Sequence, residues 1–99
     1  MKGYNEDGLR NLACAIVEQA AVDYRAAASG YRNAHQIARD SARTTGERAV
    51  YRGHETRYQH RLDELAAFFT GEYCHHLCGD AAGAILSGLR AECTTMPTR

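Results

Sequence analysis

Apolar residues recur every three or four positions through the first third of the chain, which is the spacing of one face of an α-helix. The stripe consists of Leu9, Leu12, Ala13, Ile16, Val17, Ala20, Tyr24 and Ala27. It predicts an amphipathic helix over residues 7–29 that ends at Gly30. Residues 31–42 keep the spacing with smaller side chains. They form either a short second helix or a continuation of the first.

A second long helix is predicted over residues 47–70. Thr44, Thr45 and Gly46 interrupt the apolar pattern before it, and Thr45 is the candidate N-cap. The N-terminal half carries Val50, Tyr51, His54 and Tyr58 on the predicted inner side. The motif LDELAAFF gives the strongest helical signal in the chain. We expect Leu62, Leu65 and Phe69 to form the centre of the core.

Two shorter helices are predicted in the last third of the chain. One covers residues 72–78 and ends at Gly79, and the other covers residues 81–91. Residues 94–99 are expected to be a flexible tail. The sequence has no sustained alternation of apolar and polar residues. It therefore predicts an all-α protein, a small bundle of about four to five helices with two longer helices and short C-terminal ones, in a single domain over residues 1–99.

Composition places this domain among small proteins of a reducing compartment. Hydrophobic residues make up 44% of the chain, but no run approaches the ~18 apolar residues of a membrane span. The first residues, MKGYNEDGLRN, lack the apolar stretch of a secretory signal. We therefore expect a cytoplasmic protein with reduced thiols and without a membrane partner.

Two blocks resemble a group of small, uncharacterised helical proteins of bacteriophages and prophages of gut bacteria. The blocks are AIVEQAAVDYRAA (15–27) and ELAAFFTGEYCHHLCGDAAGAILSGLR (64–90), about 40 of 99 residues. The matching positions of the second block are Phe68, Phe69, Tyr73, Leu77, Gly79, Asp80, Ile85 and Leu89. The resemblance implies a shared helical core and a phage setting in the bacterial cytosol. It transfers no catalytic residue, and the middle of the chain departs from the family's short linker.

Cysteine and histidine residues cluster in the motif Cys74-His75-His76-Leu77-Cys78. On a helix, Cys74 and Cys78 share a face and could offer two thiolates to zinc, with Cys14 or Cys93 completing the site. A disulfide and buried structural thiols are the alternatives, and burial is the ordinary state of a free cysteine. We favour structural thiols and expect no metal and no cofactor.

Arginine and tyrosine residues concentrate in the middle of the chain. Residues 24–61 hold eight arginines against three acids, whereas the flanking segments are net negative. Guanidinium groups hold phosphates or carboxylates through paired hydrogen bonds, and tyrosine rings stack on bases. An ordinary solvated helix face would give the same composition. The candidate ligand contacts are Arg25, Tyr31, Arg32, Arg39, Arg43, Arg48, Tyr51 and Arg52.

The sequence favours binding over catalysis, because it contains no phosphate-binding loop, dinucleotide fingerprint or zinc-protease motif. With the phage resemblance, the leading hypothesis is an accessory protein, not an enzyme, that antagonises bacterial anti-phage defence by sequestering a nucleotide-derived immune signal. A protein–protein inhibitor of a defence complex, similar to anti-CRISPR proteins, and a nucleic-acid-binding regulator are the alternatives. We expect a homo-oligomer, because a chain of 99 residues has little room to enclose a ligand alone.

Overall fold

The computed structural model describes residues 6–95 and consists of helices joined by short turns. Helix α1 (Glu6–Gln36) runs into a π-helical segment, η1 (Ile37–Ser41), and a turn then leads to α2 (Thr45–Thr70). Helices α3 (Glu72–Cys78) and α4 (Ala81–Thr95) follow. Residues 6–95 contain no strand. The prediction of an all-α bundle with two long helices and shorter C-terminal ones is confirmed.

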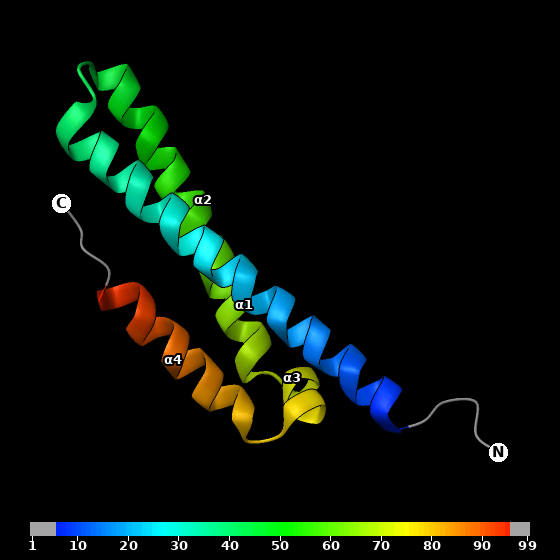
Figure 1. Ribbon diagram of the computed structural model, residues 1–99. Helices are drawn as coiled ribbons and strands as arrows, with labels where there is room; N and C mark the ends of the chain where they lie inside the picture. The colour runs from blue at the N-terminus through cyan, green and yellow to red at the C-terminus, as the bar shows by residue number, and fades with distance from the viewer. Residues whose placement is uncertain (1–5, 96–99) are drawn as a thin grey trace.

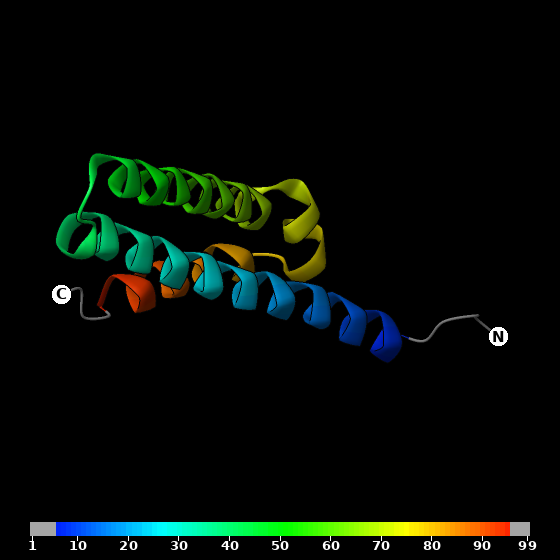
Figure 2. The same cartoon turned by 90° about the horizontal axis from the view of Figure 1, so that it is seen from above.

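Helices α1 and α2 form a long hairpin, and α4 lies along only part of it (Figures 1 and 2). The short α3 crosses the end of the hairpin at which α2 stops, and the first turns of α1 extend beyond it (Figure 2). The molecule is elongated, with extents of 66 × 24 × 18 Å. The molecule is therefore thicker where α4 lies beside the hairpin than it is near η1 (Figure 1).

Gly30 lies inside α1 and does not end it. A Cβ atom on Gly30 would lie 2.4 Å from the Cε1 and Cζ atoms of Tyr58 on α2. The glycine thus marks a close approach of the two long helices. Of the two alternatives for residues 31–42, continuation of the first helix is correct as far as Gln36, and the predicted stop at Gly30 is wrong. In a sequence, glycine is the signal both for the end of a helix and for close packing between helices.

The turn between α1 and α2 is closed by a cap one residue earlier than predicted. The Thr44 hydroxyl, not that of Thr45, accepts a hydrogen bond from the Glu47 N–H at 3.0 Å. The Glu47 carboxylate in turn accepts from the Arg43 N–H at 2.7 Å. This pair approximates a capping box, in which Ser or Thr precedes Glu by three residues.

The core lies where α1, α2, α3 and α4 meet. Its buried members are Val17, Ala20, Tyr24, Ala27, Leu65, Phe69, Cys74, Ala82, Leu86 and Leu89. The predicted core residues Leu65 and Phe69 are confirmed, whereas Leu62 is only partly buried. Leu12 and Val50 were expected on inner faces, but they are 59% and 57% exposed. Both predictions are wrong because the helix ends that carry these residues extend beyond α4.

The C-terminal third follows the sequence pattern closely. Gly79, with φ of +59°, ends α3 in the left-handed region that glycine favours. Helix α4 begins at Ala81 as predicted but continues to Thr95, so it includes the first two residues of the predicted tail. Residues 96–99 lie outside the described range. Among the helices of residues 6–95, none is both long enough and apolar enough to cross a bilayer.

Candidate ligand-binding groove

Two neighbouring cavities share Tyr31 as a lining residue, one between α1 and α2 and the other where α4 joins them, and we call the two together the Tyr31 groove. The larger, of about 460 Å³, is lined by Tyr31, Arg52, Glu55, Thr56, Gln59, His60 and Asp63. We call it the carboxylate cavity. The smaller, of about 320 Å³, is lined by Tyr24, Ala28, Tyr31, Arg32, Leu62, Arg90 and Cys93, and we call it the arginine cavity. Both volumes lie within the range of small-molecule sites, ~300–1,000 Å³.

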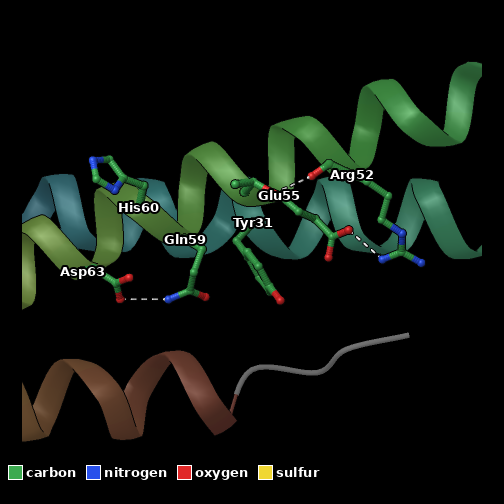
Figure 3. A pocket seen from close by; sticks show the side chains of 7 residues that line it. Tyr31, Arg52, Glu55, Gln59, His60 and Asp63 are labelled. Carbon is green, nitrogen blue, oxygen red and sulfur yellow. Dashed lines mark hydrogen bonds and ion pairs between the residues drawn. The ribbon is translucent and has the colours of Figure 1, made fainter.

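Tyr31 stands at the junction because α1 continues past Gly30. Figure 3 shows its side chain projecting from α1 beside Glu55 and Gln59 of α2, on the side where α4 ends. The ring stacks on His35, with centroids 6.1 Å apart and planes 8° from parallel. His35 lies one turn further along the same helix, so this contact holds the tyrosine ring in one orientation.

Glu55 fixes the floor of the carboxylate cavity. It is 8% exposed, and its two oxygens accept hydrogen bonds from His35 Nδ1 at 2.7 Å and Arg52 Nη1 at 2.6 Å. Burial opposes ionisation of Glu55, but the hydrogen bonds from His35 and Arg52 outweigh it and lower the pKa of Glu55 below its ordinary value. The carboxylate is therefore charged at neutral pH and ties α1 to α2 beneath Tyr31.

The arginine cavity combines two guanidinium groups with an apolar and aromatic wall. Arg32 on α1 is partly buried, and no described carboxylate lies within ion-pairing distance of it. Arg90 and Cys93 reach the cavity from α4. Burial raises the pKa of the Cys93 thiol, and the nearby Glu92 adds to this effect. The nearby Arg32 and Arg25 oppose this shift but do not reverse it, and a protonated thiol is a weak nucleophile.

Three of the eight predicted ligand contacts line the Tyr31 groove, and these are Tyr31, Arg32 and Arg52. Tyr51 lines a separate cavity of about 220 Å³ near the middle of the hairpin. Arg25 is held by Glu92, with its Nε 2.6 Å from a carboxylate oxygen. The predicted residues are therefore spread over several places and do not form one surface.

The remaining predicted contacts lie at the turn of the hairpin. Arg39 pairs with its neighbour Asp40 at 2.9 Å. Arg48 donates to the carbonyl oxygens of Ala38 and Ala42, at 3.2 and 3.4 Å, and so satisfies acceptors at the end of the first helical segment. The Arg43 side chain is exposed beside the turn. These arginines support the local structure of the turn, away from the Tyr31 groove.

The cysteine motif packs mainly into the core. Cys74 is fully buried, and its Sγ lies 3.7 Å from the Sγ of Cys78, one turn along α3. Both are free thiols. Burial and the neighbouring thiol raise the pKa of Cys74 to about 11, which keeps it protonated. The described residues include no group of three or more potential ligands positioned to hold a metal ion.

Fold and groove together define a small, elongated, all-α protein with a groove of mixed charge. Comparisons of the chain with protein-family models, curated proteins and solved structures found no match.

Sequence reasoning missed the groove residues that come from α4 and the acidic side of α2. Arg90 and Cys93 are about sixty positions from Tyr31 in the sequence, and no local pattern links them. Glu55 and Asp63 were not among the candidates, because nothing in the sequence distinguishes them from other charges on a helix. Only the packing of α2 against α1 buries Glu55, and only the placement of α4 encloses the arginine cavity.

Proposed function

We propose that this protein is a stoichiometric binding protein for a small nucleotide-derived anion, which it holds in the Tyr31 groove. The observation that carries the proposal is the partly buried Arg32, which lacks a described acidic partner and lies in one cavity with a second arginine and two tyrosines. A guanidinium group that has lost part of its hydration gains most from an anion that arrives with paired oxygen acceptors. The exposed face of an aromatic ring accepts a base by stacking.

The resemblance to phage proteins supports a biological setting for this activity. We propose that the protein is encoded by a phage or prophage, acts in the bacterial cytosol and antagonises a defence system by sequestering its nucleotide-derived immune signal. Sequestration requires only tight binding, in agreement with a groove that offers arginines, a stacking ring and one thiol, Cys93, whose pKa is raised. The protein is accordingly not an enzyme in this proposal and requires no cofactor.

Thermal-shift and calorimetric titrations with cyclic dinucleotides, cyclic oligonucleotides and ADP-ribose derivatives test the binding step. We expect one class of ligand to raise the melting temperature and to bind with a fixed ratio per chain. Arg32→Ala should weaken that binding by about tenfold or more, as expected for loss of a charged hydrogen bond. Arg43→Ala removes the same charge at the hairpin turn and should leave the affinity unchanged. Absence of binding across the panel would refute the proposal.

Self-association is a second element of the proposal. The groove is open to solvent, and α1 extends past the bundle with Leu12 exposed. A second copy that covers these regions would enclose a ligand more completely than one chain does. Sedimentation equilibrium should give a mass that is a multiple of 10.9 kDa, and Leu12→Glu should shift it to that of the single chain. A single-chain mass for the wild-type protein at high concentration, with and without ligand, would contradict this element.

A second candidate function is inhibition of a defence protein by direct contact. Exposed apolar side chains at Leu12, Val22 and Tyr73 favour it, since a partner protein that covered them would remove apolar surface from water. Complex formation with a purified defence nuclease would then be lost in Tyr73→Asp and retained in Arg32→Ala. Absence of a complex with the wild-type protein, together with nucleotide binding that Arg32→Ala weakens, would favour the small-ligand function.

A further inference from the structure

The two halves of the Tyr31 groove differ in charge, because arginines line one end of the groove and carboxylates line the other. The arginine cavity has Arg32 and Arg90 in its lining, and no carboxylate of residues 6–95 lines it. The carboxylate cavity has Glu55 and Asp63 in its lining. An elongated ligand with one anionic end would therefore meet attraction at one end of the groove and repulsion at the other.

We infer that the groove binds a nucleotide in one orientation, with the phosphates in the arginine cavity, the ring system against Tyr31, and the hydrogen-bond donors of the sugar or base in the carboxylate cavity. This inference rests on the proposed function and assigns a subsite to each part of the ligand. It also specifies the ligand class as a nucleotide whose neutral part offers N–H or O–H donors.

Asp63 selects for hydrogen-bond donors on the neutral part of the ligand. One Asp63 oxygen accepts a hydrogen bond from Gln59 Nε2 at 3.0 Å, and this contact positions the carboxylate on the groove side of α2 (Figure 3). A carboxylate has about four acceptor sites, so one bond from Gln59 leaves capacity for a ligand. Glu55 is different, because it is buried and each of its oxygens already accepts a hydrogen bond from His35 or Arg52, whereas Asp63 is exposed. Asp63 is therefore the specificity residue, and Glu55 holds the floor.

The reverse orientation is disfavoured by like charges. A phosphate in the carboxylate cavity would lie near Asp63 and Glu55, and only one arginine, Arg52, lines that half. That arginine is already paired with Glu55 at 2.6 Å. Like charges in one cavity are destabilising, whereas Arg32 has no described acidic partner that a phosphate would need to displace.

Nuclear magnetic resonance titration of the isotope-labelled protein tests this orientation, because it detects weak binding and locates it. The probes are adenosine 5′-diphosphate, adenosine and inorganic pyrophosphate, together with the matching guanosine compounds. We expect pyrophosphate to shift the amide signals of Arg32 and Cys93, and the nucleosides to shift those of Gln59 and Asp63. The diphosphates should shift both groups and bind more tightly than either fragment.

Two substitutions that each remove one charge and keep a polar side chain provide a crossed control. Arg32→Gln should weaken the diphosphate and pyrophosphate by about tenfold or more and leave the nucleosides unchanged. Asp63→Asn should weaken the nucleosides and the diphosphate but not pyrophosphate. Circular dichroism and melting curves of both variants should match the wild type, since neither residue is in the core.

The outcomes separate this inference from the proposed function. If both variants weaken the same fragments, or the fragments shift the opposite ends of the groove, the orientation is wrong although nucleotide binding stands. Binding of a cyclic oligonucleotide without binding of either diphosphate series would likewise overturn the inference alone. Absence of binding by every nucleotide would overturn both.

Discussion

The contact between Gly30 and Tyr58 offers a direct test of how α1 and α2 pack. Alanine at Gly30 would place a methyl group 2.4 Å from two ring atoms of Tyr58, whereas alanine at Gly53 on α2 would meet no atom within 4 Å. Comfortable carbon contacts are ~3.5 Å or longer, so the ring must move by about 1 Å. The two substitutions are chemically identical and both lie inside long helices.

The expected changes in the free energy of unfolding differ in sign or size between the two substitutions. Gly53→Ala should stabilise the protein by about 1 kcal/mol, the helix-propensity difference between the residues. Gly30→Ala gains the same term but adds an overpacking cost of ~1–3 kcal/mol. Tyr58 is 38% exposed, so its ring can rotate outward, which favours the lower part of that range. The two variants should differ by ~1–3 kcal/mol, or by several degrees in melting temperature.

Urea denaturation followed by far-ultraviolet circular dichroism measures these changes. Repeating Gly30→Ala in a Tyr58→Ala background removes the ring, and there the alanine should be as stabilising as it is at Gly53. This double-mutant cycle isolates the contact from changes elsewhere. Equal stabilisation at both glycines in the wild-type background would show that α1 and α2 do not approach closely at this point.

Three further predictions concern the buried carboxylate, the cap and the thiols. The pKa of Glu55 is below its ordinary value of 4.5, so the stability that it contributes is full above that pH and is lost as the pH falls through its folded pKa. Glu55→Gln should therefore lower stability at neutral pH by roughly 1–3 kcal/mol and flatten the acid limb of the stability curve, and an unchanged acid limb would contradict the role of the carboxylate. Thr44→Ala should cost about 1 kcal/mol in urea denaturation, whereas Thr45→Ala should cost less, and the opposite order would favour the cap predicted from sequence. Iodoacetamide should modify the exposed Cys14 readily and Cys74 only with unfolding, as mass spectrometry of tryptic peptides would show, and rapid labelling of Cys74 in the folded protein would contradict its burial.

Much of the fold follows from the sequence because helices are encoded locally. The three-and-four spacing from Val17 to Ala27 and the LDELAAFF motif define faces that bury themselves in the structure. Gly79 ends α3 as predicted, because a left-handed residue at that turn favours glycine. In contrast, Gly30 was misread as a helix end, since its function depends on Tyr58, a residue 28 positions further along the chain.

The candidate site was only partly visible in the sequence. Tyr31, Arg32 and Arg52 were found from the clustering of arginine and tyrosine, but the same reasoning selected Arg25, Arg39 and Arg48, which bind acidic side chains or carbonyl oxygens of the protein itself. A sequence records which groups can bind anions. It does not record which of them already have a partner.

Sequence alone determined that this chain forms helices and which stripes of those helices are apolar, because both depend on residues within a few positions of one another. Tertiary structure decided that α1 passes through Gly30, that α2 buries Glu55, and that α4 brings Arg90 and Cys93 to Tyr31. These outcomes depend on contacts between residues far apart in the chain. Their energies arise from desolvation and charge pairing, which exist only after the helices have packed.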